Sequence, residues 1–183
     1  MMTARLTRRA GLCAAVPLAL ALAACGGGAD PVPPPAAPPA PSSPAPSVDP
    51  DAAEKTAVLK AYEGMWAARN RSYATAKLDP ELETYAGNKA LSNIKATLFY
   101  HQQQSTVMKG EPTRAPQVDS IDETRAALTD CVDTSHYTEV YVKTGKTVPV
   151  GTGPRRHHYT ASAIKTGGKW VIWTTTIERD RTC

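Results

Sequence analysis

A proline-rich run limits where this chain can fold. Between Pro31 and Pro50, ten of twenty residues are proline, and most of the others are Ala or Ser. Such a segment has too little apolar surface to offset the entropy cost of ordering, and its prolines favour polyproline II. At about 3.1 Å per residue it reaches roughly 60 Å. We interpret residues 25–50 as a disordered, semi-rigid spacer rather than a proline-rich ligand for another domain, and we assign the globular fold to residues 51–183.

The segment before the spacer has the pattern of an export signal. Arg5, Arg8 and Arg9 give it a basic start, and residues 10–21 are almost wholly apolar. That run is shorter than the roughly 20 residues that a membrane-spanning helix needs. A basic start, a short apolar run and small residues after it are typical of a secretory signal peptide. The Arg8-Arg9 pair also hints at the twin-arginine route, but Ala-Gly follows where a bulkier apolar pair is expected, so the general and twin-arginine routes both stay open.

The apolar run ends in Leu22-Ala23-Ala24-Cys25. This tetrapeptide resembles the lipobox of bacterial lipoproteins. The resemblance implies a signal peptide of residues 1–24, cleavage before Cys25 and a diacylglycerol group on its sulfur, with two acyl chains being about what stable anchoring requires. We therefore expect a lipid-anchored protein on the outer face of the cytoplasmic membrane, with membrane lipid as the partner of Cys25. The alternative is a plain secreted or cytosolic chain in which this cysteine occurs by chance.

Residues 51–183 have the length of one domain with its own core. They carry eighteen basic and fifteen acidic side chains, a balance of +3. So small a charge argues against nucleic acid or a strongly acidic partner. No P-loop, dinucleotide fingerprint, Gly-x-Ser-x-Gly or His-Glu-x-x-His pattern occurs, and the sequence predicts neither a cofactor nor a metal.

Two cysteines remain after Cys13 leaves with the signal peptide and Cys25 takes lipid. Cys131 and Cys183 would then lie in an oxidising compartment, where a single disulfide is the expected outcome. A structural bridge is favoured over a catalytic pair, because no Cys-x-x-Cys or neighbouring His-Cys arrangement is present.

The first part of the domain is predicted to be helical. Asp49-Pro50 is a helix start signal, and apolar residues then recur at three- and four-residue spacing up to Trp66 and Arg69. Gly64 within this helix marks the close approach of another element. A short segment over residues 81–86 and a helix over residues 89–104 follow. The inward residues that we expect in that helix are Leu91, Ile94, Leu98 and Phe99.

The second part is predicted to form strands. Pro112 and Pro116 confine residues 113–121 to an edge or a bulged start. Residues 124–134 and 137–142 alternate, and Gly167-Gly168 turns residues 155–165 back into residues 169–178. Trp170 and Ile172 share one face of this last strand, with Val171, Trp173 and Ile177 on the other. We therefore expect the last strand to lie well inside the sheet, covered on both faces at least in part.

Helices followed by a long antiparallel sheet give an α+β fold. The helix with Tyr62 and Trp66, the short middle helix and the closing Gly-Gly-Lys-Trp-Val-Ile strand resemble the nuclear transport factor two-like superfamily. Thr-Asp-Cys-Val-Asp with a terminal cysteine is similar to small, mostly uncharacterised lipoproteins of this type from high-GC Gram-positive bacteria. The resemblance implies three N-terminal helices packed on a curved sheet, a cone with a pocket at its open end. Trp66, Leu98 and Trp173 are the expected pocket residues.

Asp130 is the candidate for chemistry. It shares a strand face with Leu128, and if that face lines the cone, its carboxyl lies among apolar side chains, surroundings that suit a general base. In enzymes of the family an aspartate often works with His or Tyr. The candidate partners are His157, His158, Tyr137 and Tyr159. The alternative is a hydrogen-bonded structural aspartate.

Arg155-Arg156-His157-His158 is the other conspicuous stretch. Adjacent strand residues point to opposite faces, so the two histidines cannot both bind one metal. The quartet either meets an anionic wall polymer or lipid headgroup, or is a solvated strand start whose charges balance across the hairpin. A two-residue loop places His157 opposite Glu178, and a three-residue loop places Arg156 there.

Two functions from different classes follow from these residues. The favoured one is a tethered, non-catalytic module that binds a small molecule, a wall component or another envelope protein through its cone or sheet face. The alternative is a small lyase, isomerase or hydrolase of the superfamily's type that uses Asp130 with a His or Tyr. The sequence leaves the ligand and the oligomeric state open.

Overall fold

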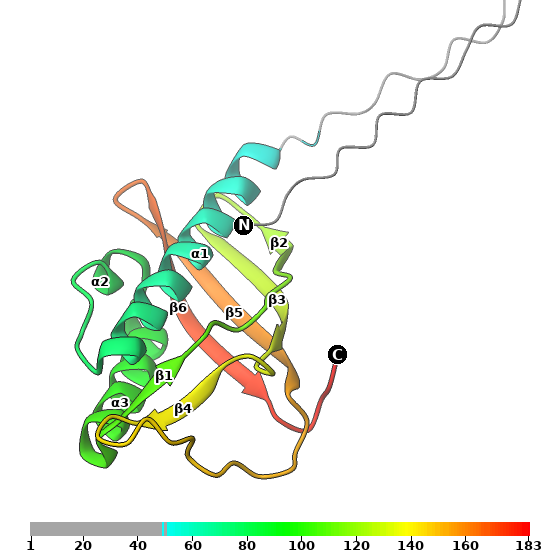
Figure 1. The fold of residues 1–183 in the computed structure, drawn as a ribbon. Helices are drawn as coiled ribbons and strands as arrows, with labels where there is room; N and C mark the ends of the chain where they lie inside the picture. The colour runs from blue at the N-terminus through cyan, green and yellow to red at the C-terminus, as the bar shows by residue number, and fades with distance from the viewer. Residues whose placement is uncertain (1–48, 50) are drawn as a thin grey trace, which may run out of the picture. The chain divides into compact units, whose positions relative to one another are not determined.

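The computed structural model describes Asp49 and residues 51–183. Within this part the chain folds as α+β, with helices against one face of an antiparallel sheet, as Figure 1 shows. Three helices precede six strands. The elements are α1 (Ala52–Thr75), α2 (Leu82–Tyr85), α3 (Asn88–Gln104), β1 (Thr106–Lys109), β2 (Gln117–Ile121), β3 (Arg125–Asp133), β4 (Thr138–Tyr141), β5 (Arg156–Thr166) and β6 (Lys169–Glu178).

Helix α1 begins at Ala52, just after the predicted Asp49-Pro50 start signal, but its N-cap is Asp51 instead of the expected Asp49, and the Asp51 side chain makes no capping hydrogen bond. Asp49 Oδ1 accepts a hydrogen bond from the Asp51 amide at 2.9 Å. The predicted apolar stripe is buried from Val58 through Tyr62 to Trp66. The helix ends at Thr75, and the following residue, Ala76, caps it with a left-handed backbone (φ 52°). The close approach expected at Gly64 is confirmed, because a Cβ there would lie 2.6 Å from Cε1 of Tyr85.

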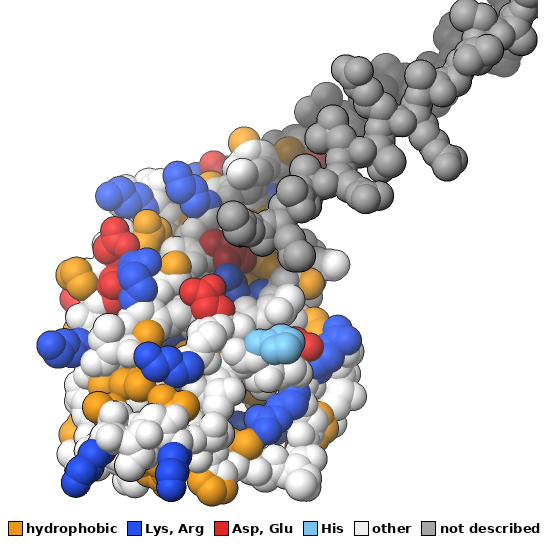
Figure 2. All heavy atoms as spheres, viewed as in Figure 1, with side chains coloured by type: hydrophobic (Ala, Val, Ile, Leu, Met, Phe, Trp, Pro, Cys, Tyr) orange, Lys and Arg blue, Asp and Glu red, His pale blue; other side chains and the backbone are white. Residues whose placement is uncertain are grey.

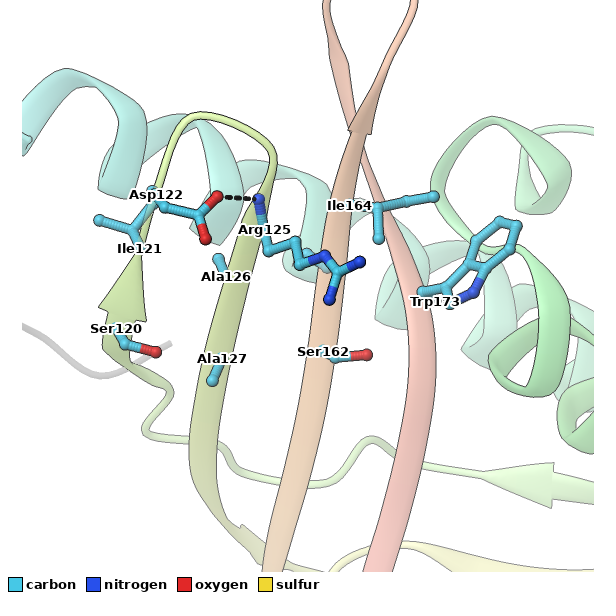
Figure 3. A pocket seen from close by; sticks show the side chains of 10 residues that line it. Ser120, Ile121, Asp122, Arg125, Ala126, Ala127, Ser162, Ile164 and Trp173 are labelled. Carbon is cyan, nitrogen blue, oxygen red and sulfur yellow. Dashed lines mark hydrogen bonds between the residues drawn. The ribbon is translucent and has the colours of Figure 1, made fainter.

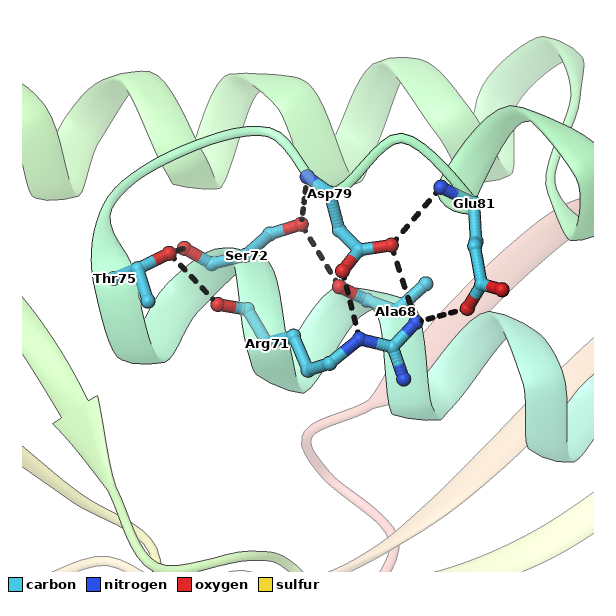
Figure 4. Close-up of polar contacts among 6 residues, drawn as sticks. All are labelled: Ala68, Arg71, Ser72, Thr75, Asp79 and Glu81. Carbon is cyan, nitrogen blue, oxygen red and sulfur yellow. Dashed lines mark hydrogen bonds and ion pairs between the residues drawn. The ribbon is translucent and has the colours of Figure 1, made fainter.

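A polar network holds the turn between α1 and α2 (Figure 4). The Arg71 guanidinium donates to both carboxylate oxygens of Asp79, at 2.7 and 3.1 Å, and to Glu81. The Ser72 hydroxyl accepts the Asp79 amide at 3.0 Å. Because Arg71 bonds to the Asp79 carboxyl, it holds the pKa of that group below its usual value. This turn fixes α2 against α1 and so places Tyr85 over Gly64.

Helix α3 buries Ile94 and Leu98 as expected, and Leu91 is partly buried. The expectation for Phe99 is wrong, since 60% of this side chain is exposed. Phe99 follows Leu98 directly, and one helical residue is a rotation of about 100°, which carries the ring off the inward face.

The main sheet has the strand order β2-β3-β5-β6, all antiparallel. The predicted alternation in β3 is confirmed, with Ala126, Leu128, Asp130 and Val132 facing the helices. The edge or bulged strand predicted within residues 113–121 is confirmed as β2, which lies at an edge of the sheet and shifts register between Val118 and Ser120. The hairpin between β5 and β6 turns over Gly167-Gly168, as expected.

The interpretation of β6 is wrong in three respects. It lies at an edge of the main sheet instead of inside it, and the loop before α3 covers that edge, where the Gly87 amide donates to the Ile172 carbonyl at 2.9 Å. A register shift opposite Ser162 and Ala163 leaves Trp173 without a partner. This one-residue β-bulge places His158, instead of His157 or Arg156, opposite Glu178, and it brings Ile177 to the same face as Ile172.

A second, two-stranded sheet joins β1 to β4. Strand β4 lies within the predicted segment 137–142, whereas the four residues of β1 were not predicted. The predicted disulfide is present and links Cys131 on β3 to Cys183, so that the C-terminal residue is tied back across β5.

Candidate functional site

Asp130 lies on the helix-facing side of β3 and is 3% exposed. Its Oδ2 accepts a hydrogen bond from the Tyr62 hydroxyl at 2.9 Å, and its Oδ1 accepts one from the Ala115 amide at 2.7 Å. Burial, together with the Asp130 charge, raises the pKa of Tyr62, which keeps the phenol protonated and able to donate. Both oxygens of Asp130 are therefore engaged in linking β3 to α1 and to the segment before β2.

The four candidate partners do not bond to Asp130. Tyr159 is its cross-strand neighbour, but only the ring packs nearby, against Tyr62 at 6.5 Å between centroids. His157 and His158 lie opposite Val132 and Cys131, on opposite faces of the sheet as predicted. The Nδ1 atom of His158 lies 3.5 Å from Oε2 of Glu178. The tyrosine that bonds to Asp130 is Tyr62, on the inward stripe of α1, and not one of the two predicted tyrosines, Tyr137 and Tyr159.

The three expected pocket residues are not brought together. Trp66 is buried beside Tyr159, with ring centroids 5.4 Å apart. Leu98 is 4% exposed within the core. Trp173 lies on the opposite face of the sheet and is 37% exposed.

Three neighbouring cavities on the helix-facing side share Arg69 as a lining residue. We call them together the Arg69 cleft. Two measure about 430 and 460 Å³, and a small one of about 40 Å³ lies beside Trp66 and His157. The polar and charged side chains around the cleft come from α1, α3, the strands and the loops beside them. They include Tyr73, Lys89, Thr97, Thr134, Glu139, Arg155, Thr175 and Arg179.

Arg69 stands in a cage of aromatic rings. Its guanidinium carbon lies 4.4 Å from the centroid of Trp66, 4.6 Å from that of Tyr73 and 5.8 Å from that of Tyr137. These ring faces attract the cation and hold its plane. The side chain is half-buried, and its hydrogen bond within the described residues goes to Oδ1 of Asn70 at 3.2 Å.

No carboxylate of the described residues pairs with Arg69, although a guanidinium has five N–H donors. Arg155 and Arg179 extend the positive charge along the rim. The acid that lines the cleft is Glu139. Its Oε1 accepts a hydrogen bond from the Thr106 hydroxyl at 2.5 Å and lies 3.3 Å from Nδ1 of His101. Burial lowers the pKa of His101, and burial raises the pKa of Tyr137 to about 12. The cleft is therefore positively charged and has donors available.

The sequence carries a signal for this cleft. Arg69 follows Met65 by four residues and Trp66 by three, so it continues the apolar stripe of α1 with a charged residue. A charge on an inward stripe needs either a partner or a ligand.

Across the face that Figure 2 shows, lysine and arginine side chains are dispersed among uncharged ones and do not form one continuous basic surface. Within residues 51–183, no group of three His, Cys, Asp or Glu side chains is arranged to bind a metal. None of the helices described is both long enough and apolar enough to cross a membrane.

No family model and no curated protein matches this chain. Among solved structures, it is similar to the intermembrane space region of chloroplast protein ARC6, at 13% identity and a TM-score of 0.49 over 72% of this chain and 98% of that one. It is also similar to a Xanthomonas campestris protein described as a calcium/calmodulin-dependent protein kinase II association domain, at 14% identity and a TM-score of 0.38 over 63% of this chain and 83% of that one. Likenesses this distant assign neither a family nor a function.

Proposed function

We propose that this protein is a lipid-anchored binding module that takes a small anionic molecule, with a carboxylate or phosphate group, into the Arg69 cleft. The observation that carries the proposal is the half-buried guanidinium of Arg69, which is stacked on aromatic rings and has no carboxylate partner among the described residues.

The geometry suits recognition of an anion. Stacking on Trp66 and Tyr73 uses the faces of the guanidinium, so its edge stays available for the bidentate hydrogen bonds that carboxylate and phosphate accept. Partial burial strengthens such a pair relative to one in bulk water. Arg179 adds charge at the rim, and threonines such as Thr97 and Thr175 add hydroxyl groups for orientation.

The setting that we propose for this module follows from the N-terminal sequence. Residues 1–48 and Pro50, which include the lipobox and the spacer, lie outside the described residues. A lipid on Cys25 would hold the domain on the outer face of the cytoplasmic membrane, and the spacer would keep the cleft clear of the lipid headgroups. A cone-like fold of the nuclear transport factor two-like type belongs to the same proposal, because it would place such a cleft at its open end.

An enzyme that uses Asp130 is the second candidate, favoured by the 2.9 Å contact with the Tyr62 hydroxyl. Both carboxylate oxygens already accept protein hydrogen bonds, and Asp130 is not among the residues that line the Arg69 cleft. These contacts support a structural role for Asp130 more than a catalytic one. A turnover that is lost in Asp130→Asn but kept in Arg69→Gln would favour the enzyme.

Calorimetric titration of the full chain in detergent tests the cleft, with inorganic phosphate, benzoate and citrate as probes. We expect one or more of these anions to bind, and Arg69→Gln to weaken binding by about tenfold or more, since a charged hydrogen bond is worth about 1.5–3 kcal/mol. The matched control is Lys60→Gln, which removes an exposed charge from the same helix away from the cleft. Absence of binding by all three anions, or an equal loss in both variants, would contradict the proposal.

Mass spectrometry of the protein purified from membranes tests the anchor. The expected mass is that of a chain that begins at Cys25 and carries a diacylglycerol group. An intact leader or an unmodified Cys25 sulfur would refute the anchoring while leaving the anion titration unaffected.

A further inference from the structure

The face of the main sheet turned away from the helices carries a separate groove of about 520 Å³ (Figure 3). It runs across the strands, and the helices lie behind the sheet in this view. The residues that give it its character are Ser120, Asp122, Arg125, Ala127, Ser162 and Trp173. None of them lines the Arg69 cleft.

The floor of the groove is a row of small side chains. Ser120 on β2 pairs with Ala127 on β3, and Ala127 pairs with Ser162 on β5. Neighbouring strands are about 4.8 Å apart, so this low row is about 10 Å long and leaves the backbone accessible to a flat ligand. At its end, the Ser162 and Thr174 hydroxyls lie 2.6 Å apart.

Trp173 forms the wall at one end of this row. It is the unpaired residue of the β6 bulge, and bulges re-aim side chains near functional sites. The benzene part of its indole packs on Gly87, where an added Cβ would lie 2.8 Å from Cζ3. A large aromatic ring is thus fixed in position while 37% of the residue stays exposed to solvent.

The opposite part of the groove carries one acid and one base. Oδ1 of Asp122 accepts the amides of Thr124 and Arg125, both at 2.8 Å, and these hydrogen bonds lower the pKa of Asp122. The carboxylate is therefore ionised, and Oδ2 has no hydrogen-bond partner in the described part of the chain. The Arg125 guanidinium likewise has no acid partner there, and Figure 3 shows it extending over the sheet towards β5.

We propose that this groove binds an oligosaccharide, with one sugar ring stacked on Trp173 and hydroxyls of the neighbouring sugar units bonded to Arg125 and Asp122. The face of an indole carries negative charge, and the C–H groups on one side of a pyranose ring present a flat, weakly positive surface to it. Sugar hydroxyls both donate and accept, which matches a groove with one carboxylate and one guanidinium. The formal charge of this pair is zero, so the groove lacks the positive charge that would select a nucleic acid or a simple anion.

The test is titration of the full chain in detergent with cellohexaose and chitohexaose, followed by tryptophan fluorescence and calorimetry. We expect at least one of them to bind, and both Trp173→Ala and Ala127→Leu to weaken that binding by roughly tenfold. Ala127→Leu fills the floor from the solvent side, so it blocks the groove without removing a core residue. Phe99→Ala, which removes an exposed ring from α3, is the control and should bind like the parent chain.

Thermal unfolding of each variant shows whether it is folded. The proposal is overturned if neither oligosaccharide binds the folded parent chain, or if both groove variants bind as the parent does. It is also overturned if the chain is a dimer that dissociates in Trp173→Ala, because the groove would then be an interface between copies. Phosphate binding that is unchanged in Trp173→Ala separates this groove from the Arg69 cleft.

Discussion

Replacing Gly64 by Ala sets two effects of similar size against each other. Glycine within a helix costs about 1 kcal/mol relative to alanine, so propensity alone predicts that Gly64→Ala stabilises the fold. The added Cβ would lie 2.6–2.8 Å from three carbons of the Tyr85 ring. Overpacking of this kind costs about 1–3 kcal/mol. We therefore expect Gly64→Ala to lower the free energy of unfolding by up to about 2 kcal/mol, despite the gain in helix propensity.

A double-mutant cycle separates the two effects. In a Tyr85→Ala background the obstructing ring is gone, and the same Gly64→Ala change should stabilise the domain by about 1 kcal/mol. Ala67→Gly, at an exposed position of the same helix, calibrates the propensity effect without any contact change. The free energies come from urea unfolding followed by circular dichroism. A stabilising Gly64→Ala in the presence of Tyr85 would refute the packing explanation.

Three further predictions concern the disulfide and two buried polar groups. Reduction of the Cys131–Cys183 bridge, which spans 52 residues, should lower the free energy of unfolding by about 4 kcal/mol, measured in urea with and without reductant. Burial lowers the pKa of His101 in the folded state, so its contribution to stability is complete above the unfolded pKa of about 6.5 and is lost as the pH falls below that value. In a His101→Gln variant, the free energy of unfolding measured from pH 7 to 5 should lack this pH dependence. Tyr62→Phe leaves the Asp130 carboxylate one donor short and should cost about 1.5–3 kcal/mol. Tyr73→Phe should cost less, because the Tyr73 hydroxyl donates to a neutral carbonyl. Equal losses in the two variants would argue against a stronger hydrogen bond at the carboxylate.

The local pattern of the sequence predicted those elements whose burial follows a simple period. The alternation of β3 and the stripe of α1 each reflect one face packed against the core, and the period shows this directly. Gly167-Gly168 predicted the hairpin from local sequence as well, because its turn requires positive φ at both residues and glycine adopts it readily. These predictions required no knowledge of which elements meet.

The features that the sequence did not reveal depend on contacts between distant segments. Tyr62 and Asp130 are 68 residues apart, and nothing local distinguishes Tyr62 from the other tyrosines as the donor. Strand β1 is only four residues long and exists through its pairing with β4, more than thirty residues later. The edge position of β6 also depends on a distant segment. Its apolar residues are typical of a central strand, and they are tolerated at an edge because the Gly87 loop covers that edge.

The bulge at Trp173 shapes both candidate sites. In a regular strand Ile172 and Ile177, five residues apart, would point to opposite faces. With Trp173 unpaired, Ile172 pairs with Ala163 and Ile177 with Tyr159, so both face the helices, and Ile177 closes part of the Arg69 cleft. The same extra residue projects the indole into the groove on the other face. A single backbone irregularity thus supplies one wall to each site, which explains why apolar residues occur on both faces of a strand that lies at the edge of the sheet.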